Sequence, residues 1–193
     1  MIKRMLLKVS SPVFLAYYLK KHGGIWNLKR HLQCQARSSG LLLYLYDEYF
    51  AWYGSYVGLQ SQFAGEPCFP HGPYGVFISG GSKIGRNPVI FQHTTIGSDS
   101  LPGSGDEGSP TIGDNVYIGT GARIIGNIQV GDNCRIGANA VVYDDMPPHS
   151  VAVQSPTRVI RKSRLDNRYF TVRNGHWVYF DNGHWVEDSE KEL

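Results

Sequence analysis

The sequence predicts a mainly β protein built on a parallel β-helix, with a helical segment before it and a small antiparallel meander after it. The main observation is a six-residue period of aliphatic residues, which fits neither a helix at 3.6 residues per turn nor a strand alternating every two. Such a period fits a triangular coil, with one short strand and one turn on each side. Glycine directly follows six of these residues and supplies backbone freedom at the corners. The period runs through Ile78, Ile84, Ile90 and Ile96 and, after a break, Ile112, Ile118, Ile124, Val130, Ile136 and Val142.

Residues 1–54 are expected to be helical, because two apolar, aromatic-rich stretches at 13–19 and 41–53 contain neither proline nor glycine. Their faces are too apolar for solitary surface helices, so they should pack on another part of the chain. Eight basic residues and no acidic one precede Asp47, within a net charge of +3. We expect this basic arm to be a solvated helix face, with weak attraction to an anionic membrane or a phosphate-bearing substrate as the alternative.

Residues 55–162 are expected to form the β-helix, which has two interruptions. The six-residue spacing becomes nine around 70–74 and sixteen across 98–110, whose composition is that of an excursion loop. Binding and catalysis usually occur where a rigid repeat is interrupted. The two breaks are one to two coils apart, so they can share one site. Three apolar residues extend the period towards the N-terminus: Val57, Phe63 and Phe69.

The C-terminal extension, residues 163–193, contains the same five residues, Asn-Gly-His-Trp-Val, at 174–178 and 182–186. Asn-Gly between β-favouring residues is a strong hairpin signal, so residues 168–188 are predicted to form a three-stranded meander. Trp177 and Trp185 are expected to cap the open end of the coil or pack on a neighbouring subunit, with stacking on a sugar ring as the alternative.

Composition limits the other possibilities. A chain of 193 residues can bury a core without disulfides, and its three cysteines are odd in number and widely spaced. Reduced thiols in a cytoplasmic protein are therefore expected, with the inner membrane surface as a further location for the basic arm. No apolar stretch approaches the ~20 residues of a membrane span. Nucleic-acid binding is not expected, because no recognition motif accompanies the charge.

Several segments resemble the hexapeptide-repeat acyltransferases, and in particular the serine acetyltransferase branch with its relatives that acetylate sugars of surface polysaccharides. The resemblance covers about residues 56–162. It implies a left-handed coil, a homotrimer with sites between neighbouring subunits, acetyl-CoA as co-substrate and no metal. The segments that carry it are 75–80, 83–87, 95–97, 112–122, 124–128, 130–142 and 147–151.

Acetyl transfer from a thioester to a hydroxyl needs a base for the hydroxyl proton and a donor for the tetrahedral oxyanion. Histidine suits the first task, since its ordinary pKa is near neutrality. His71 lies in the first break, in a segment resembling the turn that supplies the general base in serine acetyltransferases. His93 follows 22 residues later and can face the same groove. It has no role to transfer from the family; contact with the acceptor, assistance to the base and an ordinary corner position all stay open.

The resemblance also implies where the substrates bind. Acetyl-CoA is expected along small residues on the side of the coils, with basic residues after the last coil near the nucleotide phosphates. The expected coenzyme contacts are Gly97, Ser98, Gly119, Thr120, Gly121, Ala138, Arg158, Arg161 and Lys162, and the expected acceptor contacts are Tyr74, Gln92 and Ser109.

Departures from the serine acetyltransferase pattern bear on the acceptor. The family's Arg-His-Pro, which grips the amino acid, is replaced by 108–110, Gly-Ser-Pro, at a cost of ~1.5–3 kcal/mol for a lost charge-assisted bond. Pro70 and Tyr56 stand where aspartates support the catalytic histidine, and Gln154 replaces a glycine near the coenzyme. These changes favour a sugar hydroxyl of a capsule or exopolysaccharide as acceptor. L-serine is the alternative acceptor, and a non-catalytic carbohydrate-binding or assembly protein is the alternative class.

Overall fold

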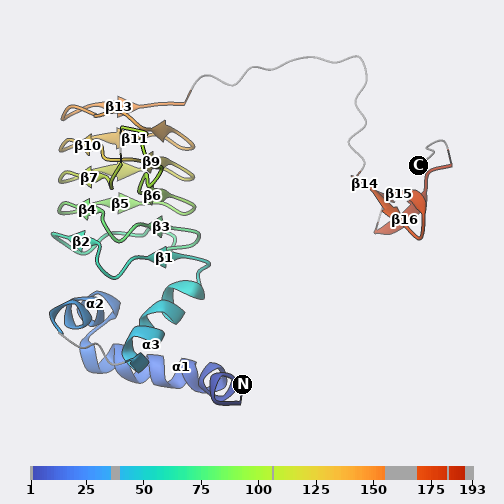
Figure 1. Ribbon diagram of the computed structural model, residues 1–193, viewed down its shortest axis with the longest axis horizontal. Helices are drawn as coiled ribbons and strands as arrows, with labels where there is room; N and C mark the ends of the chain where they lie inside the picture. Colours follow the sequence, from blue (N-terminus) through green and yellow to red (C-terminus); the bar gives the residue numbers. More distant parts are fainter. Residues whose placement is uncertain (1, 36–39, 106, 155–168, 182, 190–193) are drawn as a thin grey trace. The chain divides into compact units, whose positions relative to one another are not determined.

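The computed structural model describes residues 2–35, 40–105, 107–154, 169–181 and 183–189. The chain divides into two compact units, Met1–Ser155 and Pro156–Leu193, which are described separately. The first unit is a stack of short strands with three helices at one end, and the second is a small sheet (Figure 1).

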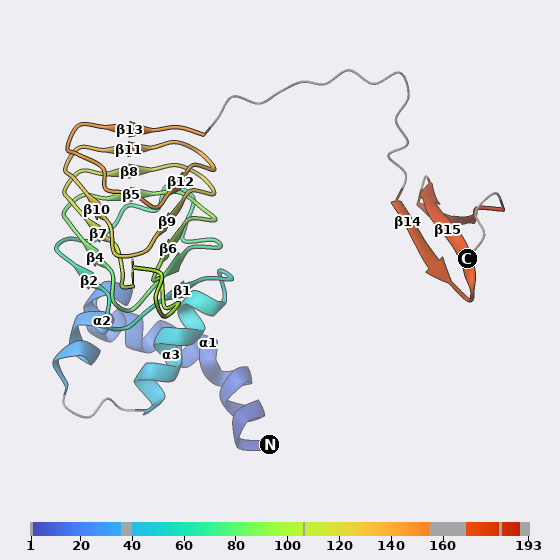
Figure 2. The ribbon, with the colours of Figure 1, turned by 45° about the horizontal axis from the view of Figure 1, so that its top comes forward.

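Strands β1 to β13 form the three faces of a triangular prism, each face a parallel sheet (Figures 1 and 2). Face A contains β1 (Tyr56–Val57), β3 (Phe77–Ile78), β6 (Thr95–Gly97), β9 (Arg123–Ile125) and β12 (Val141–Val142). Face B contains β2 (Gln62–Phe63), β4 (Lys83–Ile84), β7 (Thr111–Ile112) and β10 (Gln129–Val130). Face C contains β5 (Val89–Ile90), β8 (Tyr117–Ile118), β11 (Arg135–Ile136) and β13 (Val151–Ala152). The predicted left-handed parallel β-helix is confirmed.

The six-residue period places one apolar side chain of each strand towards the inside of the prism, an aliphatic one in every strand except β2, which has Phe63. On face A, Ile78 pairs with Ile96, and Ile96 pairs with Ile124, so that like residues stack from coil to coil. These three side chains are fully buried, whereas the residue before each one points outwards. Burying one such side chain stabilises the fold by roughly 1.5–3 kcal/mol, and the stack repeats this on all three faces.

The corners of the prism need residues that accept a left-handed backbone. At the corner between faces C and A, this position holds Gly75, His93, Gly121 and Asn139, with φ of 63°, 61°, 70° and 57°. At the corner between faces B and C it holds Asn87, Asn115, Asn133 and His149, with φ of 53°, 55°, 58° and 62°. Glycine and asparagine tolerate this conformation best. The side-chain amide of Asn87 also donates to Oδ1 of Asn115 at 3.1 Å, which links successive coils.

We name the three edges of the prism by the faces that meet there. The C–A edge comprises 70–76, 91–94, 119–122 and 137–140; the A–B edge comprises 79–82, 98–110 and 126–128; the B–C edge comprises 86–87, 114–115, 132–133 and 148–149.

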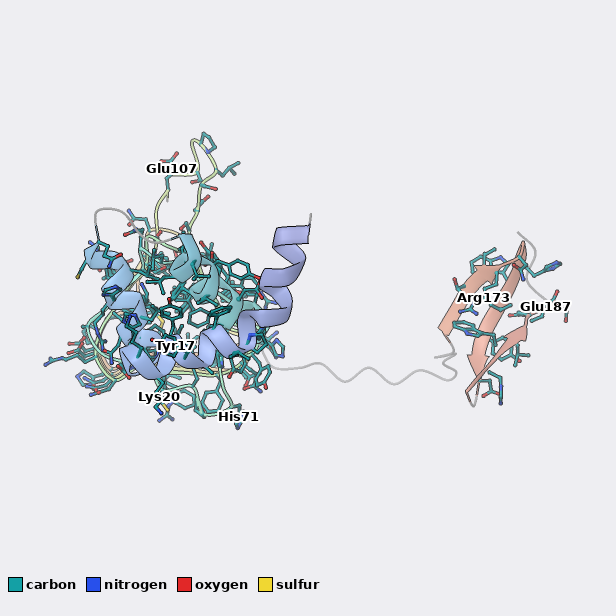
Figure 3. The ribbon with its side chains drawn as sticks, turned by 90° about the horizontal axis from the view of Figure 1, so that it is seen from below. Tyr17, Lys20, His71, Glu107, Arg173 and Glu187 are labelled. Atoms are coloured by element: carbon teal, nitrogen blue, oxygen red, sulfur yellow. The ribbon has the colours of Figure 1, made fainter. Side chains whose placement is uncertain are left out.

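The two interruptions of the repeat leave the prism at different edges. Residues 70–74 extend the C–A edge between face C and β3, whereas 98–110 leave the A–B edge between β6 and β7. Viewed along the coil axis, His71 and Glu107 lie on opposite sides of the prism (Figure 3). Within a single chain the two breaks therefore do not meet, and a site that they share stays a prediction.

Three helices, α1 (Ile2–His22), α2 (Ile25–Cys34) and α3 (Gly40–Ala51), lie at the β1 end of the prism (Figure 1). They cover the first coil with aromatic side chains. The Trp26 ring centroid lies 4.9 Å from that of Phe63 and 6.1 Å from that of Phe69. The Tyr46 hydroxyl is buried and donates to the carbonyl of Val57 at 2.8 Å. None of the described helices is both long and apolar enough to cross a membrane.

Lys29 of α2 is a buried charged residue between the helices and the first coil. Its side chain is 2% exposed, and Nζ donates to the carbonyls of Leu59 and Ser61 at 2.5 Å each. These carbonyls belong to the first coil, where no further coil lies below to supply donors. Burial lowers the pKa of Lys29 to about 8, because the charged form loses hydration.

The second unit is an antiparallel meander of β14 (Tyr169–Arg173), β15 (His176–Asp181) and β16 (His184–Glu187). Asp181 pairs with His184, so the alternation of side chains puts Trp177 and Trp185 on opposite faces of the sheet. The guanidinium of Arg173 lies 3.9 Å from the centroid of the Trp185 ring. The predicted meander is confirmed, and the capping role of the tryptophans stays a prediction.

Replacing Lys29 by methionine is expected to change how stability depends on pH. The folded state binds the Lys29 proton more weakly than the unfolded state. The wild-type free energy of unfolding therefore increases as the pH rises from 8 to 10.5. Relative to Lys29→Met, the gain should reach roughly 2–3 kcal/mol across this window. Urea denaturation at several pH values measures it. The exposed Lys20→Met is the control, and parallel curves for wild type and Lys29→Met would contradict the assignment.

Replacing Gly75 by alanine is expected to destabilise the protein for two reasons. A left-handed alanine costs about 1–2 kcal/mol, and the added Cβ would collide with the His93 ring. Gly54→Ala is a matched control, because Gly54 has φ of 60° and open space around its Cβ position. Thermal unfolding should show a larger loss for Gly75→Ala than for Gly54→Ala; equal losses would mean that the His93 ring does not pack on Gly75.

Candidate functional site

His71 lies at the C–A edge in a tight turn. The Gly72 amide closes this turn by donating to the Phe69 carbonyl at 3.0 Å. The imidazole is exposed, and two neighbours from the next coil hold it. Nδ1 lies 3.1 Å from Oε1 of Gln92, and the ring meets the Phe91 ring edge-on at 5.5 Å between centroids. The turn is therefore an interruption of the repeat with a defined side-chain geometry.

The corner that carries Phe91 and Gln92 is itself fixed by hydrogen bonds. The buried Thr94 hydroxyl donates to the Phe91 carbonyl at 2.8 Å, which closes the corner. The Gln92 carbonyl accepts from the Gly121 amide of the following coil at 3.0 Å. These hydrogen bonds fix the backbone that carries the Gln92 side chain.

His93 occupies the left-handed position of the same corner. Its amide donates to the Tyr74 carbonyl at 2.8 Å, and its exposed ring packs over Gly75, whose missing Cβ makes the space. A non-glycine residue in this conformation costs roughly 1–3 kcal/mol, and such positions are frequent at functional sites. The other coils hold glycine or asparagine here, so the imidazole of His93 is an addition to what the corner requires.

Small residues continue the edge beyond the two histidines. The same corner position is held on successive coils by Tyr74, Gln92, Thr120 and Ala138. The backbone amide of the residue that follows each of the last three donates a hydrogen bond to the carbonyl of the residue in this position one coil earlier. The glycines beside them cannot be larger: a Cβ on Gly119 would lie 2.8 Å from the Ala138 amide nitrogen. The C–A edge therefore joins the predicted residues His71, His93, Tyr74, Gln92, Gly119, Thr120, Gly121 and Ala138 in one line.

Ser98 and Ser109, predicted for the same site, lie instead on the A–B edge at the base of the excursion loop, and Gly97 ends β6 directly before it. The hydroxyls of Ser98 and Ser109 are 2.7 Å apart. Asp99 and Gly108 exchange two backbone hydrogen bonds of 2.9 Å, which hold the two ends of the loop together. Within one chain, this group does not meet His71.

The described part of the excursion loop is acidic and internally bonded. Asp99 accepts from the Leu101 amide at 2.8 Å, and Glu107 accepts from the Gly103 amide at 2.7 Å. The Leu101 amide, with the Ser104 hydroxyl, lowers the pKa of Asp99. No basic residue occurs in residues 98–110.

Arg158, Arg161 and Lys162, the predicted phosphate contacts, lie outside the described residues. Two other arginines, which were not among the predicted site residues, lie on strands of the two faces that meet at the C–A edge. Arg123 on face A donates to the Gly121 carbonyl at 3.3 Å, and Arg135 on face C lies 5.8 Å from the Tyr117 ring centroid. Their outward positions on strands next to the corner were the only sequence signal.

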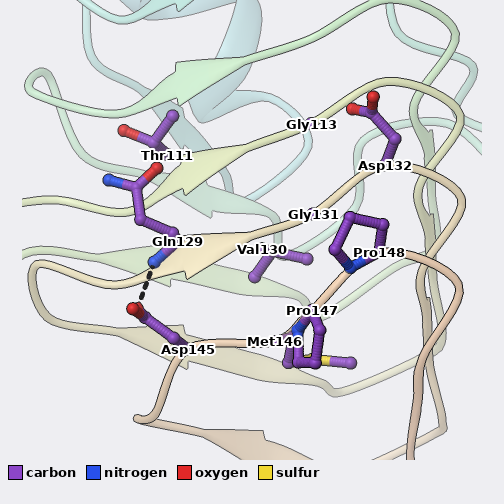
Figure 4. Close-up of a pocket in the computed structure, with 10 residues that line it drawn as sticks. All are labelled: Thr111, Gly113, Gln129, Val130, Gly131, Asp132, Asp145, Met146, Pro147 and Pro148. Carbon is purple, nitrogen blue, oxygen red and sulfur yellow. Dashed lines mark hydrogen bonds between the residues drawn. The ribbon is translucent and has the colours of Figure 1, made fainter.

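A hollow of about 620 Å³ lies on face B, away from both histidines (Figure 4). It forms where the last coil is shortened, and Asp145 there accepts from the Gln129 amide at 2.7 Å. Ten residues line it: Thr111, Gly113, Gln129, Val130, Gly131, Asp132, Asp145, Met146, Pro147 and Pro148. None of them is a predicted site residue, so the candidate site remains the C–A edge.

The chain is similar in sequence and in structure to known acetyltransferases. Residues 109–144 match the family model described as bacterial transferase hexapeptide (six repeats). The serine acetyltransferase of Mycobacterium tuberculosis is 40% identical over 90 residues, covering 47% of this chain and 38% of that protein. The serine acetyltransferase of Helicobacter pylori is 41% identical over 108 residues, covering 47% and 63%. The solved structure of soybean serine acetyltransferase complexed with serine is 32% identical, with a TM-score of 0.58, covering 70% of this chain and 56% of that chain.

These findings overturn the sugar acceptor and the role in polysaccharide biosynthesis inferred from the sequence, because the relatives named here are serine acetyltransferases. They also lend no support to association with a membrane through the basic arm. The chain spans less than two thirds of the length of these relatives. Residues 109–144 thus belong to a hexapeptide-repeat transferase domain, carried on a left-handed β-helix similar to that of serine acetyltransferases.

Proposed function

We propose that this protein is a serine O-acetyltransferase that uses acetyl-CoA, with His71 as the general base. The observation that carries the proposal is the position of His71: an exposed, oriented imidazole on an edge of a β-helix whose relatives are serine acetyltransferases. A solved relative with serine bound supports serine as the acceptor.

The reaction follows from the chemistry of the imidazole. His71 takes the proton from the serine hydroxyl as the oxygen attacks the thioester carbonyl carbon. The tetrahedral intermediate then breaks its carbon–sulfur bond. The coenzyme A thiolate leaves and receives the proton from the imidazolium. The products are O-acetylserine and coenzyme A, and no covalent enzyme intermediate is formed.

Acetyl-CoA fits the small residues of the C–A edge. Thr120 and Ala138 have small side chains that project little from this edge, so an extended pantetheine arm can lie along it next to His71. Arg123 and Arg135 stand on either side of the edge and provide positive charge for the anionic end of the coenzyme.

The excursion loop can complete the site only in an assembly, and a homotrimer meets this requirement. Face A lies between the C–A and A–B edges, so a three-fold ring with face A inwards sets the A–B edge of one copy against the C–A edge of the next. Face A exposes Tyr56, Phe77 and Val141 at 51%, 47% and 55%. The outward strand residues of face B are polar: Gln62, Lys83, Thr111 and Gln129. The loop of one copy would then cover His71 of its neighbour.

The serine carboxylate needs a positively charged partner, and the loop cannot supply one because residues 98–110 contain no basic side chain. His93 lies on the same edge as His71, and its ring is exposed. We assign His93 to bind the carboxylate of the acceptor.

Removing the His71 imidazole is expected to abolish most of the activity. His71→Ala should lower kcat with serine by roughly 10²–10⁴-fold, the contribution of a positioned general base. The assay is thiol release from acetyl-CoA with L-serine, and coenzyme A binding by calorimetry should be unchanged. His149→Ala removes an exposed histidine from the B–C edge and should leave kcat as in wild type. Near-normal turnover of His71→Ala, or no thiol release by wild type with serine, would refute the proposal.

Substituting His93 by asparagine is expected to weaken serine binding without a comparable loss of kcat. Asparagine holds this left-handed corner position at Asn139, so the backbone should be preserved. Loss of a hydrogen bond to a charged group, worth ~1.5–3 kcal/mol, should raise the KM for serine roughly tenfold or more. His149→Asn, the same change at φ of 62° on another edge, is the matched control. A KM equal to that of the control would exclude this role for His93.

A further inference from the structure

His71 has an amide partner in place of a carboxylate. Pro70 and Tyr56 stand where the resembling enzymes have aspartates, and among the described residues the hydrogen bond of the imidazole goes to Gln92. We propose that Gln92 is the positioning residue for the general base: its amide oxygen fixes the tautomer of His71 that can accept a proton. This inference rests on the proposed function, in which His71 is the base.

The tautomer follows from the atoms in contact. Oε1 of Gln92 is an acceptor only, so Nδ1 of His71, 3.1 Å away, must carry the proton and donate it. In a neutral imidazole the proton on one nitrogen leaves a lone pair on the other. Nε2 is therefore the basic atom, and it is the nitrogen turned away from the corner.

The partner is held firmly enough to impose this choice. The Gln92 carbonyl accepts from Gly121, and the neighbouring His93 amide donates to Tyr74, so the coils above and below fix the backbone at 92–93. The Gln92 side chain is partly buried, unlike the exposed imidazole that it holds.

A second contact restricts rotation of the ring. Phe91, from the same corner as Gln92, meets the imidazole edge-on, and Tyr117 lies behind Phe91 at 5.2 Å between ring centroids. One corner thus supplies both the hydrogen bond and the packing that orient His71. Such outer contacts matter because a displacement of about 1 Å can cost roughly 100-fold in rate.

An amide and a carboxylate differ in their effect on the charged base. The amide oxygen stabilises imidazolium through a dipole, and a carboxylate does so through a full charge, which favours protonation more strongly. Among the described residues, the other titratable groups near this corner are His93, Tyr53, Tyr74 and Tyr117, with Arg135 beyond Tyr117. Variants at position 92 leave all of them unchanged.

The test combines NMR of ¹⁵N-histidine-labelled full-length protein with steady-state kinetics. In wild type, the His71 nitrogen shifts should show a protonated Nδ1 and an unprotonated Nε2 at pH above the imidazole titration. Gln92→Leu removes the acceptor and should produce a mixture of tautomers. It should also lower kcat with serine roughly 10- to 100-fold, with the KM for acetyl-CoA unchanged.

Gln92→Glu separates positioning from simple structural support. It should keep the wild-type tautomer and retain activity, while the acid limb of the kcat/KM profile moves up by about one pH unit. Gln129→Leu on face B is the control and should change neither the shifts nor the profile.

The two proposals fail in different measurements. If the His71 tautomer in Gln92→Leu equals that of wild type, Gln92 is not the positioning residue, whatever the activity. An acid limb that stays in place in Gln92→Glu overturns the proposal as well. Failure of the proposed function appears instead as normal turnover in His71→Ala, a variant that leaves Gln92 intact.

Discussion

The β-helix depends on the need to bury one apolar side chain on every side of every coil. Each of its strands is only two or three residues long, too short to be stable alone, and gains its hydrogen bonds from the coils above and below. The stacking of Ile78, Ile96 and Ile124 keeps these bonds in register. The corners must then turn within a few residues, which explains the left-handed glycines and asparagines along the edges.

The same constraint determines where chemistry can occur. The interior is filled by aliphatic residues and the faces are regular, so only the edges can accept residues that the repeat does not require. At the C–A edge, the inserted turn presents His71, and a histidine replaces the glycine or asparagine of other coils at position 93. The rigid coils around these residues supply the partners, Gln92 and Phe91, from the next turn of the prism.

The sequence predicted the β-helix well, because a six-residue period leaves few other folds that can bury the repeated residue. It also identified His71, Gln92 and Thr120 as residues of interest, and these lie along one edge. It did not predict on which edge the excursion loop lies, because periodicity along the chain counts residues between breaks but does not say which side of a triangle each break leaves. The place of Ser109 in the site of His71 stays a prediction. The sugar acceptor was wrong: a missing basic pair was taken to change the substrate, although charge can come from another part of the fold.

By itself, the sequence determined the prism, its inward residues and the presence of two interruptions, because these depend on spacing along the chain. Only the tertiary structure decided that the interruptions lie on different edges, that Lys29 closes the first coil and that Gln92 faces His71. These contacts join residues some 20 to 30 positions apart in the sequence. They depend on how coils of unequal length stack on one another, and local spacing does not contain that information.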